Sequence, residues 1–186
     1  MKIDLAIAGY RGTGLDSRVI EVRSLSPYSH VSFVLLDRNG NPDMEWEAWS
    51  ENANKKNSLF FWRNGSVQFV KFGRNHAKGT RVDLIIFPDY ATLDVDKLLA
   101  FCNEHSGEPY DWEGVFMVPF QHKETDKEFW RKWFCSKFVF MGCRAGELAC
   151  SGMRVNLVNG KRPEKVTPGD IMHNAIMLPY KTIRRS

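Results

Sequence analysis

Short apolar runs, separated by glycine, proline and polar residues, recur along the first half of the chain. The runs 2–8, 30–36, 44–50, 67–72 and 81–87 have strand length, and the last is almost continuously apolar, as in a central strand. Turn residues fill 37–42, between two of these runs. We predict that the four segments between 30 and 87 form an antiparallel meander. The glycines at 9, 12 and 14 predict a loop after the first strand.

A different periodicity marks the helices. In 92–106 apolar residues recur at spacings of three and four, Thr92 can cap the start, and Gly107 ends the pattern. A shorter helix is predicted for 15–25, and a buried helix follows directly after Cys135, ending near Gly146. The segment 167–170 predicts a turn before a last strand. The fold class is therefore α+β, with an antiparallel sheet packed against helices.

Length and charge restrict the function classes. At 186 residues with no repeat and no internal linker, the chain is expected to form a single domain, 1–186. The net charge of +4 is too small and dispersed to indicate nucleic acid as a partner. Neither an apolar run of about 20 residues nor a signal peptide is evident. We therefore expect no transmembrane segment and a cytoplasmic location.

The residues that most suggest chemistry are Cys135, at the start of a predicted helix, and His30, at the start of a predicted strand. A helix N-terminus and a neighbouring imidazole both favour the thiolate, which is the nucleophile. A third group must orient the imidazole, and Glu45, Glu47 and Ser50 on the next strand are available. We choose Glu47. The alternative is that Cys135 and His30 are ordinary core residues and Glu47 an exposed carboxylate.

A zinc site is the other chemistry that the cysteines could offer. It would combine Cys135, Cys143 and Cys150 with His122 or His173. Structural zinc ligands usually come in closely spaced Cys pairs, and the cysteine spacing here does not fit. We therefore expect free thiols, no metal and no cofactor.

Five short motifs, in their order along the chain, together resemble a known family. They are Ser29-His30-Val31, Glu47-Ala48, Pro109-Tyr110-Asp111-Trp112, Phe134-Cys135-Ser136 and Thr167-Pro168-Gly169-Asp170-Ile171. They resemble the landmarks of the circularly permuted branch of the NlpC-type papain-like cysteine hydrolases, which includes YiiX-type and phage-encoded members. The resemblance extends from about residue 29 to residue 171.

The resemblance implies a permuted papain-like fold in which the histidine strand precedes the cysteine helix, the reverse of the papain order. It assigns Cys135 as nucleophile, His30 as base and Glu47 as the orienting residue. It implies hydrolysis or transfer of acyl groups at amide, ester or thioester bonds, with peptides, peptidoglycan fragments or acyl lipids as substrates and no cofactor. Phage relatives add a virion-associated location as a possibility.

Lys137 departs from the family pattern, because many relatives carry an acidic residue two positions after the cysteine. This lysine either changes the preference for substrate charge or lies on a solvated face. The departure also supports a second hypothesis, in which the chain is a non-catalytic binding or virion-structural module on the same scaffold.

Overall fold

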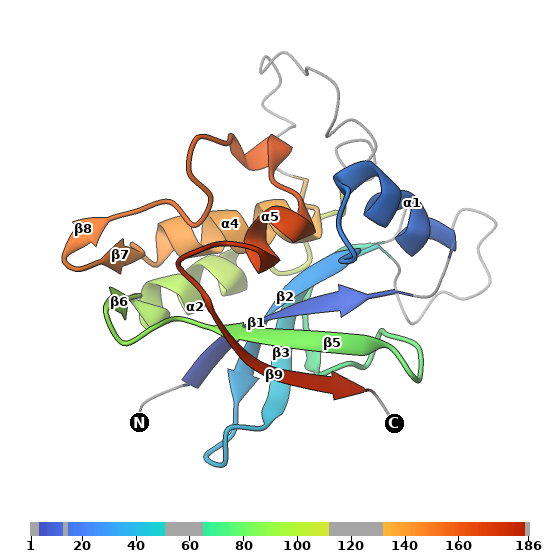
Figure 1. The fold of residues 1–186 in the computed structure, drawn as a ribbon, viewed down its shortest axis with the longest axis horizontal. Coiled ribbons are helices and arrows are strands. Elements are labelled where there is room, and N and C mark those ends of the chain that lie inside the picture. Colours follow the sequence, from blue (N-terminus) through green and yellow to red (C-terminus); the bar gives the residue numbers. More distant parts are fainter. Residues whose placement is uncertain (1–3, 13–14, 51–64, 112–131, 185–186) are drawn as a thin grey trace.

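A computed structural model describes residues 4–12, 15–50, 65–111 and 132–184, and shows helices packed against an antiparallel sheet (Figure 1). The elements are, in chain order, β1 (Asp4–Arg11), α1 (Leu15–Ser24), β2 (His30–Leu36), β3 (Pro42–Trp49), β4 (Ser66–Lys71), β5 (Arg81–Ile86), β6 (Ala91–Thr92), α2 (Val95–Glu104), α4 (Cys135–Ala145), β7 (Ala149–Cys150), β8 (Met153–Arg154), the 3-10 helix η3 (Pro163–Lys165), α5 (Pro168–Met172) and β9 (Leu178–Arg184).

The main sheet has six strands in the order β4-β3-β2-β1-β5-β9, and each neighbouring pair is antiparallel. The predicted meander is therefore wrong at its last step, because β5 pairs with β1 rather than with β4. The apolar run in β5 reflects burial on both faces: Val82 and Leu84 face one core cluster and Ile85 faces the other. Hydropathy indicates that such a strand is buried, but it does not identify the neighbours.

Gly9 lies inside β1 and does not begin a loop, so the first strand extends beyond its predicted end. A Cβ atom at this position would lie 2.6 Å from side-chain atoms of Met172. Glycine is needed here because α5 packs directly on the strand, and a close approach of this kind has the same sequence signature as a strand break.

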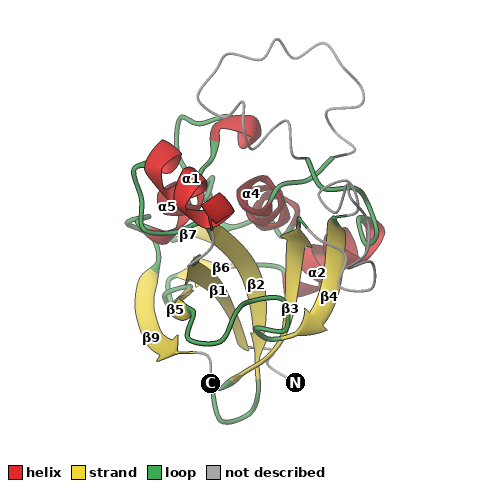
Figure 2. Cartoon of the chain, turned by 90° about the vertical axis from the view of Figure 1, so that its right-hand side faces the viewer, coloured by secondary structure: helices red, strands yellow, loops and turns green. Residues whose placement is uncertain are grey.

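The larger core lies between the sheet and the helices. Helix α4 contacts β2, β3 and α2, and Figures 1 and 2 both show it on the same side of the sheet as α2. From the sheet, Phe33, Trp46 and Ala48 point into this core, and from α4 Phe138 and Val139 do. These strand residues alternate with polar ones, so Glu45 and Glu47 must point to the opposite face.

That opposite face carries a smaller apolar cluster that includes Ala6, Ala8, Tyr10 and Val34. The connection between β4 and β5, residues 72–80, covers part of it. Phe72 packs against the cluster, and the Gly73 amide donates a hydrogen bond to Glu45. The polar residues of β2 and β3 are therefore enclosed between the sheet and this connection.

Two helix boundaries differ from the prediction. Helix α2 begins at Val95 with Asp94 as its N-cap, because the Asp94 side chain accepts a hydrogen bond from the Lys97 amide, and Thr92 belongs to β6. Residues 168–172 form the short helix α5 instead of a turn. Thr167 and Asp170 make a reciprocal capping box at its start, which the spacing of the two residues had already encoded.

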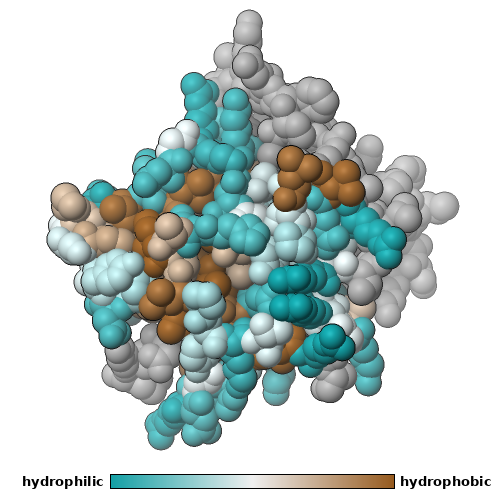
Figure 3. Space-filling view, viewed as in Figure 1, coloured by the Kyte–Doolittle hydropathy of each residue, from teal (hydrophilic) through white to brown (hydrophobic). Residues whose placement is uncertain are grey.

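Among the described residues, no helix is long and apolar enough to cross a bilayer. Apolar side chains are nevertheless exposed at the end of α1, where Val22 and Leu25 are 74% and 94% accessible. Figure 3 shows apolar surface over this part of the molecule.

Candidate active site

Cys135 is the first residue of α4, as predicted. Phe134 is the N-cap and has an extended backbone, and it provides no side-chain hydrogen bond to the helix start. The amides of the first turn have no partner within a helix, and the helix dipole makes this end positive. The sulfur of Cys135 therefore lies where negative charge is favoured, and it is almost fully buried.

His30 begins β2 and lies opposite Tyr10 of β1. Its Nε2 atom is 3.0 Å from Oε2 of Glu47 on the neighbouring strand. An ionised carboxylate only accepts hydrogen bonds, so Nε2 carries a proton and donates a hydrogen bond to Glu47. In the neutral imidazole, Nδ1 then has the lone pair that can accept a proton.

His30 also interacts with Cys135. Burial would lower the pKa of His30, but the charge of Cys135, a side-chain hydrogen bond with Cys135, and Glu47 raise it to about 10. The His30 ring therefore lies close enough to Cys135 and Glu47 for both of them to raise its pKa.

Glu47 has no accessible surface, which excludes the alternative of an exposed strand carboxylate. Burial would raise its pKa, but hydrogen bonds and charges from His30 and His76 lower it to about 2. Asn75 adds a hydrogen bond to its other oxygen at 2.6 Å. Glu47 is therefore ionised in the fold and holds the His30 ring in one tautomer and one orientation.

Glu45 points to the same face but has different partners. It accepts hydrogen bonds from Ser32 and from Tyr10, and a third from the Gly73 amide. Burial and the nearby charge of Glu47 raise its pKa to about 7. The two glutamates thus differ in role, because Glu47 carries the charge beside the imidazole and Glu45 ties the strands to the connection above them.

His76 is the residue at this site that the sequence analysis missed. It comes from the 72–80 connection, and its Nε2 atom lies 3.4 Å from the same Glu47 oxygen that His30 contacts. Its ring stacks on Tyr10, with centroids 3.5 Å apart and planes 5° apart. No motif surrounds His76, and only the fold brings it to the site.

Lys137 does not lie on a solvated face, because its side chain is fully buried. Its Nζ atom donates to the carbonyl of Lys132 at 2.9 Å and lies 5.0 Å from the centre of the Trp133 ring. Burial lowers its pKa to about 8. The side chain is thus part of the packing around the start of α4.

Residues 109–111 of the aromatic motif pair with the segment just before the same helix start. Tyr110 belongs to the large core and pairs with Trp133. Burial, and then the charges of Cys135, Asp111 and Glu47, raise the pKa of Tyr110 well above its usual value. Tyr110 therefore packs close to the thiol and the carboxylate, while Trp112 lies outside the described residues.

The cysteine-based zinc set finds no support in the described residues. Cys143 is buried in the core, where burial raises its pKa, and His173 packs against Tyr28 instead. His122 lies outside the described residues. The four cysteines are free, as predicted.

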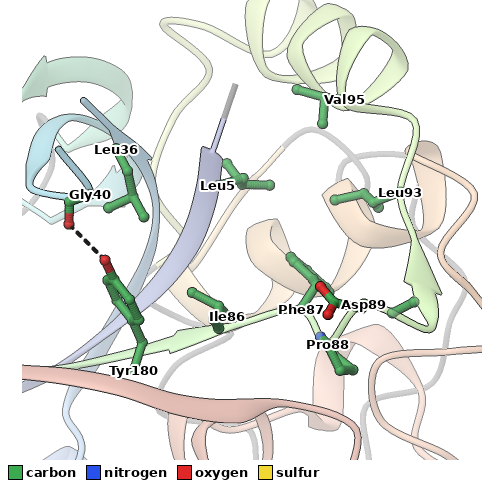
Figure 4. Close-up of a pocket in the computed structure, with 11 residues that line it drawn as sticks. Leu5, Leu36, Gly40, Ile86, Phe87, Pro88, Asp89, Leu93, Val95 and Tyr180 are labelled. Atoms are coloured by element: carbon green, nitrogen blue, oxygen red, sulfur yellow. Dashed lines mark hydrogen bonds between the residues drawn. The ribbon is translucent and has the colours of Figure 1, made fainter. Parts of the chain in front are cut away.

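A cavity of about 530 Å³ lies away from these residues, lined mainly by apolar side chains that include Leu5, Leu36 and Ile86 (Figure 4). Leu36 pairs with the start of β1, whereas His30 pairs with its far end. Six residues of strand separate the two, a distance of about 20 Å. The cavity is therefore distinct from the thiol and imidazole.

The fold and the site together define an α+β protein with a buried thiol at a helix start and, on an antiparallel sheet, an imidazole bonded to a carboxylate. No family model and no curated protein matches the sequence. Among solved structures, one described as metalloprotein yiiX from Escherichia coli O157:H7 is similar, with a TM-score of 0.55 and 14% identity. The match covers 99% of this chain and 97% of that chain, so the two proteins share a YiiX-like fold over their whole length.

Proposed function

We propose that this chain is a cysteine hydrolase that acts through an acyl-enzyme, with Cys135 as nucleophile, His30 as base and acid, and Glu47 as the orienting residue. The observation that carries the proposal is the hydrogen bond between His30 Nε2 and Glu47, and the interaction of the same ring with Cys135 at the start of α4 supports it. This arrangement suits proton transfer between a nucleophile and a base of fixed tautomer.

The reaction begins from the ion pair in which His30 already holds the thiol proton, and the thiolate of Cys135 attacks the carbonyl carbon of the substrate. The oxyanion that forms can accept a hydrogen bond from the backbone amide of Cys135, at the positive end of α4. His30 then gives its proton to the leaving nitrogen, oxygen or sulfur. The product of this half-reaction is a thioester on Cys135.

In the second half-reaction, a water or another acceptor loses its proton to His30 and adds to the thioester carbonyl. Collapse of the intermediate releases the acyl product, and the proton returns to the sulfur. Suitable substrates are acyl compounds such as peptides, peptidoglycan fragments or acyl lipids. We further propose that residues 1–186 form one domain of the circularly permuted papain-like type, a proposal that the histidine-before-cysteine order and the YiiX-like fold support.

The first test measures the alkylation rate of each cysteine by iodoacetamide at about pH 6.5, resolved by peptide mass spectrometry. Burial raises the pKa of Cys102 to about 12, so its thiolate fraction under these conditions is on the order of one in a million. We expect Cys135 to react first, and His30→Gln to slow it at least tenfold. Cys150→Ala is the control and leaves the rate at Cys135 unchanged. Faster labelling of Cys102, Cys143 or Cys150 than of Cys135 would refute an activated thiol.

The second test screens wild type and Cys135→Ala against peptide, ester and thioester libraries. Turnover in the wild type that Cys135→Ala abolishes supports the hydrolase. Equal turnover in both proteins would remove Cys135 from the mechanism. A reactive Cys135 without any turnover, together with a partner interaction that survives Cys135→Ala, would favour the non-catalytic module.

A further inference from the structure

His30, Glu47 and His76 form a group whose ligand atoms all lie within 4.8 Å of one another. All three side chains are buried, and they come from three separate segments: the start of β2, the end of β3 and the 72–80 connection. Two imidazoles with one carboxylate are a donor set that binds Zn²⁺ in catalytic sites. This donor set contains no cysteine, so the cysteine spacing that argues against a zinc site does not apply to it.

The distances fit a shared tetrahedral ion. With metal-to-ligand bonds of about 2.0–2.1 Å, two donors on one tetrahedral ion are about 3.3–3.4 Å apart. Glu47 Oε2 lies 3.0 Å from Nε2 of His30 and 3.4 Å from Nε2 of His76. The two histidine nitrogens lie within 4.8 Å of each other, so side-chain shifts of about 1 Å would let all three atoms contact one ion.

Surrounding residues hold these donors in place. Asn75 bonds to the second oxygen of Glu47, and the Tyr10 ring stacks on His76. Trp49 contacts both imidazoles edge-on, with ring centroids 5.1 Å from His30 and 4.7 Å from His76. Hydrogen bonds to the ligands and apolar side chains around them fix ligand orientation and limit access of water at metal sites.

We propose that His30, Glu47 and His76 bind one divalent transition-metal ion, such as Zn²⁺, and that the bound ion switches off the thiol. A metal on Nε2 of His30 displaces the proton from that nitrogen, so the neutral ring carries its proton on Nδ1 instead. Nδ1 then has no lone pair for the thiol proton, and His30 no longer acts as a base. The switch rests on the hydrolase function proposed above, whereas the metal site does not.

Isothermal titration of chelator-treated protein with ZnCl₂ tests the site. The wild type is expected to bind one equivalent, and His76→Ala to weaken binding on the order of 100-fold. The exposed His173 provides the matched control, since His173→Ala should change the affinity less than about threefold. Equal binding by wild type and His76→Ala would overturn the site. Thermal unfolding checks that each variant is folded, and His76→Gln replaces any His76→Ala protein that is not.

Co²⁺ provides a spectroscopic readout that is independent of activity. Tetrahedral binding gives visible absorption bands in the wild type that His76→Ala loses, and Cys135→Ala should keep them, because Cys135 is not one of the three proposed ligands. Loss of the bands in Cys135→Ala would overturn the proposed ligand set. One equivalent of Zn²⁺ should also slow alkylation of Cys135 at least tenfold, and EDTA should restore the rate. An unchanged alkylation rate with metal bound would overturn the switch alone.

The two proposals fail in distinguishable ways. If the protein binds one equivalent of Zn²⁺ but the metal-free protein hydrolyses no substrate, the metal site is supported and the hydrolase is refuted. If the protein hydrolyses a substrate, one equivalent of Zn²⁺ does not change the rate and no heat of binding is measured, the hydrolase is supported and the metal site is refuted.

Discussion

Replacing Lys137 by methionine tests how burial at the start of α4 controls stability. The unfolded lysine titrates near 10.5, whereas burial lowers the pKa of Lys137 to about 8 in the fold. Between these values the unfolded chain binds more protons, so the lysine contribution to the unfolding free energy rises with pH. The difference of about 2.5 pH units corresponds to about 3 kcal/mol. Below pH 8 the wild type therefore carries this full cost.

Methionine has a similar volume and no charge, so Lys137→Met removes the cost. It also removes the hydrogen bond to the Lys132 carbonyl and the contact of the ammonium with Trp133, together about 1–2 kcal/mol. We expect the variant to be about 1–2 kcal/mol more stable than the wild type at pH 7. Near pH 10.5 it should be less stable, because the lysine is then neutral in the fold and half neutral in the unfolded chain, so the cost of burying its charge is almost gone.

Urea unfolding of both proteins at a series of pH values from 7 to 10.5 measures this difference. Taking the difference cancels the titration of the groups that the two proteins share. The exposed Lys78→Met serves as the control and should show a difference that does not depend on pH. A flat difference for Lys137→Met would show that burial does not disfavour the charge, and the reasoning would be wrong.

Three further predictions concern single side chains. Glu47→Gln should weaken the loss of unfolding free energy at acid pH. The low pKa of Glu47 gives a stabilising contribution that is complete above pH 4.5 and is lost as the pH falls through about 2. Urea unfolding between pH 5 and 3 should therefore show a smaller decline for the variant than for the wild type. Gly9→Ala should cost about 1–3 kcal/mol in urea unfolding, because its Cβ would meet Met172, and Met172→Ala in the same chain should recover part of that loss. Thr167→Ala should lose about 1 kcal/mol with a lower Tm, since it breaks the capping box with Asp170, whereas Thr167→Ser should retain stability.

The sequence predicted most elements of the fold because their signals are local. Helix α4 begins at Cys135 and β2 begins at His30, as the patterns indicated. The position of β5 between β1 and β9 was not predictable, because any strand with two buried faces has the same apolar run. Gly9 was misjudged for a related reason, since the residue that requires glycine there is more than 160 positions away.

The proposed site also contains residues that have a local sequence signal and one that has none. Strand alternation placed Glu45 and Glu47 on one face, and the distance from Glu47 to His30 follows from the pairing of adjacent strands. His76 had no such signal, because it lies in a connection whose path depends on what covers the sheet. Its stacking on Tyr10 and its approach to Glu47 are tertiary contacts between segments far apart in the sequence.

The burial of this cluster bears on the choice between an enzyme and a binding module. His30, Glu45, Glu47 and His76 are each less than a tenth exposed. Removing charges from water costs several kcal/mol per ion, and a buried ion pair can often be replaced by apolar side chains without loss of stability. Stability alone therefore does not account for this cluster. Strongly shifted pKa values close to a thiol at a helix terminus are typical of sites that transfer protons, which supports the proposed hydrolase.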